Sequence, residues 1–365
     1  MENDLSNNIN EAQNALNLII KKSRVHFYKP IQIAEILFNH RVDEKINLER
    51  LEDYRNISKK WRDKITQRFL GRICTSSAKF QDNLFEVNAM PPKLLAVLGD
   101  FNKQENGIVE AHIYKSFADK YFQLNNALNY CLDARSDSFK LDHFLGMFWK
   151  EPGLKRSIDK IFEIIVYALF ETIITNADIK VEITANDPNK ILYEFSGFAE
   201  KVIGLNDKNN RVIFNAHFHR VGVTNAADRG LDIFANFGAA IQVKHLNLSE
   251  EIAEGITETI TANKIVIVCK SAEVKVISSL LTQIGWRSRI QGIITIEELL
   301  SWYDRALTGK HHLLLGKTLL ENIREQIQLE FPSVGSNEFD RFIKERAYHQ
   351  IKHTQWKSFY NKQTK

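Results

Sequence analysis

A carboxylate, an amide and an amine stand at short spacing in the middle of the chain. Asp232 precedes Gln242 by ten positions, and Lys244 follows two residues later. Carboxylate and amide oxygens are suitable ligands for a hard cation such as Mg²⁺. A lysine beside such an ion can orient an attacking water and balance developing negative charge. The three residue types together therefore fit metal-assisted hydrolysis of a phosphodiester.

The residues between these side chains predict a β-hairpin. A short apolar run follows Asp232, a turn is expected near Gly238, and a second apolar run covers 239–243. Alternate side chains of a strand share one face, so Gln242 and Lys244 point the same way. If the first strand pairs beside the second, Asp232 reaches that face as well. The hairpin would then gather all three groups around one point.

The segments around the hairpin predict an α/β core. A largely buried helix precedes the strands because 157–176 is almost entirely apolar and too long for a strand. The expected order is the helix 157–176, strands near 180–184 and 191–195, the hairpin, a helix opening at Ser249, a strand over 264–269, a helix over 271–284, a strand near 290–294, and helices from Thr295, Leu313 and Asn337.

The buried helix carries an acid that needs an explanation. A carboxylate on an apolar helix is unfavourable to bury without a partner. Glu163 lies in the middle of this helix and is therefore a candidate for a role in the site. The alternative is an ion pair at the helix end. Glu171, nearer the end of the helix, is expected at the surface.

The motif resembles that of a known nuclease superfamily. The spacing of Asp232, Gln242 and Lys244 resembles the PD-(D/E)xK nucleases, and the segment RGLDIFANFGAAIQVKHLNL is similar to type II restriction endonucleases, most nearly the HaeII-like group. Two positions depart from the common pattern. Leu231 stands where proline is frequent, and Gln242 stands where most members carry Glu or Asp.

The resemblance implies a fold and an activity. It implies a mixed central sheet flanked by helices, and Mg²⁺-dependent cleavage of double-stranded DNA within a specific sequence. Asp232 would ligate the metal directly, with the backbone carbonyl of Val243 as a further ligand. Gln242 would contribute an amide oxygen or position a water, Lys244 would orient the attacking water, and Glu163 would act through water. A homodimer and a cognate DNA methyltransferase encoded nearby are the implied partners.

Three other interpretations remain open. The same core could serve a DNA repair or junction nuclease that cuts by structure rather than by sequence. The loss of a carboxylate at Gln242 could also mark a DNA-binding protein without catalytic activity. His217 and His219, with His245 nearby, could instead form a transition-metal site, although no Cys or carboxylate stands at zinc-ligand spacing.

A basic row on one predicted helix is a candidate DNA contact. Lys60, Lys64, Arg68 and Arg72 recur every four residues, so they share one helix face. Such a row can follow a phosphate backbone, and a solvated helix face would look the same. The following segment, CTSSAKFQD, adds hydroxyls that can contact phosphates or bases, including Ser76 and Ser77.

Composition describes an ordinary globular chain. Its 365 residues are 44% hydrophobic and 26% charged, with a net charge of +4 that is compatible with a polyanionic partner. Three dispersed cysteines predict neither a disulfide framework nor a zinc knuckle, and no apolar run is long enough to span a membrane, so a cytoplasmic location is expected. The predicted regions are a helical N-terminal region at 1–150 that is a candidate for contributing to DNA binding, the nuclease core at 151–300, and a helical C-terminal extension at 301–365.

Overall fold

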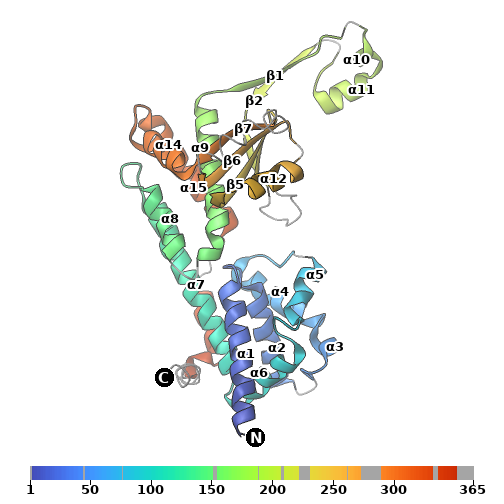
Figure 1. Cartoon of the computed structure of the whole chain (residues 1–365), viewed down its shortest axis with the longest axis vertical. Helices are drawn as coiled ribbons and strands as arrows, with labels where there is room; N and C mark the ends of the chain where they lie inside the picture. Colours follow the sequence, from blue (N-terminus) through green and yellow to red (C-terminus); the bar gives the residue numbers. More distant parts are fainter. Residues whose placement is uncertain are drawn as a thin grey trace.

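The structure is a computed structural model. It describes residues 2–43, 46–75, 77–150, 154–187, 189–206, 209–221, 231–260, 262–272, 289–331 and 336–351. A helical region lies at one end of the long axis, an α/β region at the other, and a thin arm projects from the α/β region (Figure 1).

The N-terminal region is helical, as its sequence predicts. Among its described residues up to 150 there is no strand. Helix α2 is the most deeply buried helix of this region, with residues 30–37 all buried. The helices are α1 (Glu2–Lys22), α2 (Tyr28–Val42), α3 (Leu51–Tyr54), α4 (Ile57–Leu70), α5 (Ala78–Asp82), α6 (Pro92–Gln104), α7 (Ile108–Asp133) and α8 (Leu141–Lys150).

The α/β region is built on a mixed five-stranded sheet in the order β3-β4-β5-β6-β7. Strands β3, β4 and β5 pair antiparallel, whereas β5, β6 and β7 pair parallel. The strands are β3 (Phe218–Arg220), β4 (Ile233–Ala235), β5 (Ala239–Leu248), β6 (Lys264–Ala272) and β7 (Ile290–Thr295). This arrangement confirms an α/β fold with a mixed sheet.

Helices cover both faces of this sheet, because its strands are apolar on both sides. Ile241 and Val243 of β5 join the main core beneath α9 (Ile158–Asn176), α14 (Ile296–Thr308) and α15 (His312–Glu330). Ala240 faces the other way and belongs to a second, smaller core beneath α12 (Glu250–Thr259). The expected helices from residues 157, 249, 295 and 313 are therefore confirmed.

One sequence prediction in this region is wrong, and another is wrong in where its element begins. Residues 191–195 were expected to form a strand, but α10 (Ile191–Glu194) is a short helix. Its first turn is held by Asp187, whose carboxylate accepts the backbone N–H groups of Ile191 and Leu192. The helix expected over 271–284 cannot begin at Ser271, because β6 continues to Ala272. Residues 273–284 lie outside the described part of the chain.

The last described helix returns to the N-terminal region. Phe342 of α16 (Ser336–Glu345) packs against Phe69 of α4 and Tyr114 of α7, with ring centroids 5.1 and 4.6 Å apart. The hydroxyl of Tyr348 donates to buried Glu110 at 2.6 Å. Helices α14 and α15, by contrast, pack in the α/β region. Among the described residues, no helix is long and apolar enough to cross a membrane.

The arm is a two-stranded antiparallel ribbon with a small helical tip. Strands β1 (Lys180–Thr184) and β2 (Arg211–Asn215) form the ribbon and belong to no larger sheet. The tip contains α10, α11 (Ser196–Phe198) and the π-helical turn η3 (Ala199–Ile203). At its base, the Ala216 N–H donates to the Ile179 carbonyl at 2.9 Å.

Candidate active site

The predicted hairpin brings Asp232 and Gln242 into contact. Strands β4 and β5 are joined by a tight turn in which Gly238 adopts a left-handed φ of 98°. Asp232 comes immediately before β4, opposite Gln242 in the antiparallel register. The Gln242 side-chain amide donates to Asp232 Oδ2, and the Val243 backbone N–H donates to the same oxygen at 2.8 Å.

Gln242 is almost completely buried, and only one of the two polar atoms of its side-chain amide has a hydrogen-bond partner in the described chain. Its exposed fraction is 1%, and its amide oxygen Oε1 has no hydrogen-bond partner among the described residues. A buried acceptor without a donor is unfavourable by about 1–3 kcal/mol. A cation beside the carboxylate of Asp232 would satisfy such an oxygen. The N–H and C=O of a strand residue point to the same strand edge, so the Val243 carbonyl also faces the side of Asp232.

Lys244 lies on the same face of β5 as Gln242. Among the described residues no carboxylate lies within ion-pair distance of its ammonium group, but its charge lowers the pKa of Asp232. Burial acts in the opposite direction and is the larger effect, so the pKa of Asp232 is raised overall. His245 points to the other face, where its ring pairs with Asp159 in the first turn of α9.

Glu163 lies close to this group, and its environment is unusual for a carboxylate. Its pKa is raised to about 7: burial has the largest effect, the neighbouring charge of Lys160 lowers the pKa, and the charge of Asp232 raises it. The Lys160 ammonium donates to both Glu163 oxygens at 2.9 and 2.7 Å. Glu163 therefore forms the ion pair that was the alternative prediction, with Lys160 as its partner. It is also close enough to Asp232 for the two charges to interact.

Sequence reasoning missed Lys160 and Arg220. Arg220 of β3 has a side chain only 2% exposed, lies 3.9 Å from Glu163, and donates to Glu330 of α15 at 3.1 Å. Only the packing of β3, α9 and α15 brings these groups together, so no local pattern could reveal Arg220. Lys160 could have been found, because residues three apart on a helix are neighbours.

Comparison with known proteins assigns the family. The model of the HaeII restriction endonuclease family matches residues 12–348. The chain belongs to the HaeII restriction endonuclease family. It is 54% identical to the type II restriction enzyme HaeII of Haemophilus aegyptius over 343 residues, which is 94% of this chain and 97% of that enzyme. It is 56% identical to the type II restriction enzyme NgoBI of Neisseria gonorrhoeae over 93% of this chain and 96% of that enzyme. No solved structure matches the chain.

The predicted basic row of this HaeII-family protein divides into two pairs. Lys60 and Lys64 are exposed on α4 and make no ion pair with any described residue. Arg68 is bound to Glu338 and Glu345 of α16, and Arg72 donates to the Leu329 carbonyl at 2.8 Å.

The two serines of the following segment cannot be treated alike. The Ser77 hydroxyl accepts the Phe80 N–H at 3.3 Å and caps α5, so it is engaged within the chain. Ser76 lies outside the described residues. Of the six predicted DNA-contacting residues of this HaeII-family member, Lys60 and Lys64 are the two charged side chains that have neither an ion pair nor a hydrogen bond with a described residue.

The alternative histidine site is not assembled among the described residues, where no three His, Cys, Asp or Glu side chains gather at metal-binding distance. The ring of His217 bonds to Glu171 at 2.7 Å, and His219 stacks on Phe234 at 4.9 Å. Glu171 was expected at the surface, but it also accepts the Phe218 N–H at 2.8 Å. Its carboxylate therefore holds the start of β3 against α9.

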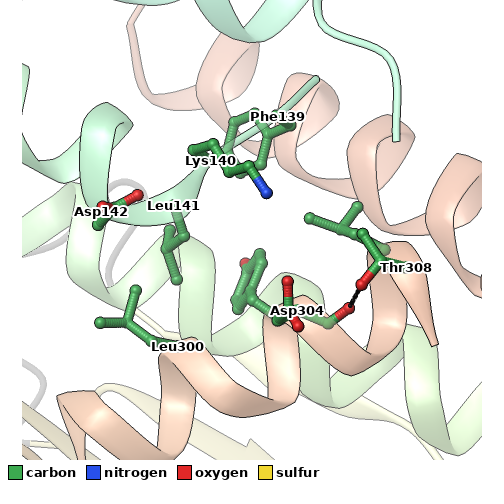
Figure 2. A pocket seen from close by; sticks show the side chains of 9 residues that line it. Phe139, Lys140, Leu141, Asp142, Leu300, Asp304 and Thr308 are labelled. Atoms are coloured by element: carbon green, nitrogen blue, oxygen red, sulfur yellow. Dashed lines mark hydrogen bonds between the residues drawn. The ribbon is translucent and has the colours of Figure 1, made fainter. Parts of the chain in front are cut away.

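A shallow cavity lies elsewhere in this HaeII-family structure. It has a volume of about 230 Å³ and lies between the start of α8 and the end of α14 (Figure 2). The Lys140 amine and the Asp304 carboxylate point toward it, and the remaining lining is mostly apolar. It shares no lining residue with the group around Asp232, so it is separate from the candidate active site.

Proposed function

We propose that this protein is a type II restriction endonuclease that uses Mg²⁺ to cut phosphodiester bonds within a specific sequence of double-stranded DNA. The observation that carries the proposal is the contact of Asp232 with Gln242 and Val243 at the centre of a mixed sheet. More than half of the residues are identical to those of two type II restriction enzymes over nearly the whole chain. The core corresponds best to the PD-(D/E)xK nuclease core.

The oxygen groups at the site fit Mg²⁺. Asp232 would provide a carboxylate, Gln242 its unsatisfied amide oxygen, and Val243 its backbone carbonyl. An amide is nearly symmetrical in shape, so the oxygen of Gln242 can exchange places with the nitrogen that now faces Asp232. Hard oxygen donors of this kind, with few charges and remaining water ligands, are typical of magnesium sites. A bound Mg²⁺ supplies charge stabilisation at the scissile phosphate and lowers the pKa of a bound water.

The other side chains act on water and charge. Lys244, which has no described ion-pair partner, would orient the attacking water and balance charge that develops on the phosphate. Glu163 would hold a water on the opposite side of Asp232, and its pKa of about 7 allows it to accept or release a proton near neutrality. Lys160 and Arg220 keep the Glu163 carboxylate in place.

The partners follow from this activity. Double-stranded DNA is the substrate, and the exposed Lys60 and Lys64 would contact its backbone phosphates. A homodimer suits a target of two-fold symmetry, because protein symmetry then mirrors DNA symmetry. A DNA methyltransferase of the same specificity, encoded nearby, would protect the host genome, and both proteins would work in the cytoplasm.

The decisive experiment is digestion of unmethylated phage DNA with purified protein in Mg²⁺. We expect discrete fragments from the wild type, and at least about a 100-fold loss of rate in Asp232→Ala and Lys244→Ala. Lys264→Ala, at the exposed start of β6, is the matched control and should cut normally. Omission of the metal should stop cleavage in every variant.

Two other outcomes would favour different functions. Cleavage of branched or damaged DNA, with none on intact plasmid, would favour a structure-selective nuclease. Salt-sensitive binding without cleavage in any divalent metal would favour a DNA-binding protein that has lost catalysis, with Gln242 as the reason.

A further inference from the structure

The arm of residues 180–215 has one apolar face that the described chain covers only in part. In the β1–β2 register, Val181 lies opposite Phe214, and Ile183 opposite Val212, so these four side chains share one face. The opposite face is mostly polar and carries the ion pair of Glu182 with Arg211, together with the half-exposed Ile213. None of the ten residues of the two strands is buried.

The tip of the arm exposes apolar side chains as well. It has a small centre of its own, because Ala199 and Leu205 are buried and the Leu205 N–H donates to the Ala199 carbonyl at 3.0 Å. Its largest apolar side chains nevertheless point outward. The exposed fractions are 54% for Ile191, 69% for Tyr193, 56% for Phe195, 51% for Phe198 and 68% for Val202.

An arm of this kind needs a partner. A two-stranded ribbon is marginally stable in water unless a third strand or a packed surface covers its apolar face. The arm projects away from the sheet, so the rest of the described chain does not complete that cover (Figure 1). Several large exposed apolar side chains on one projecting element indicate an interaction site.

The charge of the arm favours a protein partner over DNA. Residues 180–215 contain five basic and five acidic side chains, so their net charge is zero. DNA-binding surfaces neutralise phosphates with an excess of Lys and Arg. Protein interfaces are instead rich in aromatic residues and poor in charged residues at their core.

We propose that the arm is the dimerisation element of this enzyme, and that it packs against the arm of a second copy of the chain. The proposal rests on the proposed function, for which a two-fold dimer places two active sites on one DNA duplex. A symmetric interface buries the same patch on both copies. Half-exposed large apolar side chains each offer on the order of 100 Å². The tip and the ribbon face of two arms together therefore reach the roughly 1,200–2,000 Å² of a specific interface.

The test is the oligomeric state of the full-length protein, measured by sedimentation over a range of concentrations. We expect a mass of twice 42.2 kDa for the wild type. The double substitution Phe195→Asp with Phe198→Asp should raise the dimer dissociation constant at least about 30-fold. Thr184→Asp with Ser196→Asp is the matched control, because it adds the same charge to exposed polar positions of the same arm and should leave the dimer intact.

The outcomes separate this proposal from the proposed function. A monomeric wild type would overturn the role of the arm in dimerisation, even if the protein cuts DNA at discrete sites. A dimer whose dissociation constant is unchanged by the double substitution would overturn it as well. A wild-type dimer that the double substitution disperses would support the role of the arm, even if no DNA is cut. A monomer whose DNA affinity falls with the double substitution would overturn dimerisation and assign the arm to DNA.

Discussion

Gln242 sets the charge of the candidate site. An amide at this position leaves Asp232 without a second carboxylate at its side in the hairpin pair, so the site holds less negative charge than two acids would give it. Two neighbouring carboxylates repel each other without a cation. The amide therefore lets the site stay folded without metal, at the expense of attraction for the ion.

The substitution Gln242→Glu tests whether the amide favours stability without metal over affinity for the ion. We expect the free energy of unfolding without divalent cation to fall by about 1–3 kcal/mol, because a second carboxylate would lie buried against Asp232. Mg²⁺ should then stabilise the variant more than it stabilises the wild type. Thermal unfolding in EDTA and in Mg²⁺ measures both effects. Gln67→Glu, exposed on α4, is the control, and equal behaviour of the two variants would contradict the prediction.

Glu163 should make stability depend on pH. Its pKa is raised from 4.5 to about 7 in the folded state, so the folded protein binds more protons than the unfolded chain between these values. The contribution of Glu163 to the free energy of unfolding is therefore fully present below pH 4.5. It is lost as the pH rises to about 7, and the loss is on the order of 3 kcal/mol. The pKa of Asp232 is raised as well, so it acts in the same direction.

Glu163→Gln should remove most of this slope. The measurement is urea unfolding of wild type and variant from pH 5 to 8, with the exposed Glu49→Gln as control. Parallel curves for wild type and Glu163→Gln would show that Glu163 does not titrate in this range.

At the level of elements, helix α4 combines two kinds of basic residue. Arg68 joins α4 to α16 through Glu338 and Glu345, so its loss should reduce stability. Lys60 and Lys64 have no such contacts and are available to phosphates. The members of the predicted row thus have different roles, because α16 binds Arg68, whereas Arg72 lies beyond the end of α4 at Leu70 and donates to Leu329 of α15.

We expect Lys60→Ala with Lys64→Ala to weaken DNA binding and to reduce its salt dependence. Each lost phosphate contact should lower the slope of log affinity against log salt by about 0.9. Binding to one duplex at several salt concentrations in Ca²⁺ measures the slope. The exposed lysines Lys115 and Lys317 provide a matched double-alanine control. An unchanged slope in the α4 variant would exclude this helix from the DNA interface.

Local patterns predicted the elements that carry the site. A tight turn fixes the register of a hairpin, so the ten-residue spacing of Asp232 and Gln242 was enough to place them together. The prediction of a strand over 191–195 was wrong because it relied on a pattern of apolar residues. Its apolar side chains are exposed on the arm, so their pattern does not report burial. Arg220 could not be predicted either, because its partner Glu330 lies 110 residues away in α15.

On the scale of the whole molecule, the N-terminal helices depend on the C-terminal segment. Phe342 is 1% exposed and completes an aromatic cluster with Phe69 and Tyr114. Arg346 adds an ion pair with buried Glu35 at 3.1 Å. Residues nearly 300 positions apart therefore share one core.

Phe342→Ala should destabilise the helical region by about 3–5 kcal/mol, because a large buried ring would be replaced by a cavity. Phe122→Ala removes the same group from α7, where the ring is 67% exposed, and should change stability little. Guanidinium unfolding followed by circular dichroism compares the two. If both substitutions had the same small effect, α16 would not support the N-terminal core.

The return of α16 to the N-terminal helices also affects the order in which the protein is made. A ribosome adds about 5–20 residues per second, and domains that are local in sequence fold as they emerge. The aromatic cluster here lacks Phe342 and Tyr348 until more than nine tenths of the chain has been synthesised. The helical region therefore reaches its final packing only after the hairpin with Asp232 and Gln242 has already been translated, so the core of the first helices is completed after the strands that carry the candidate site have been made.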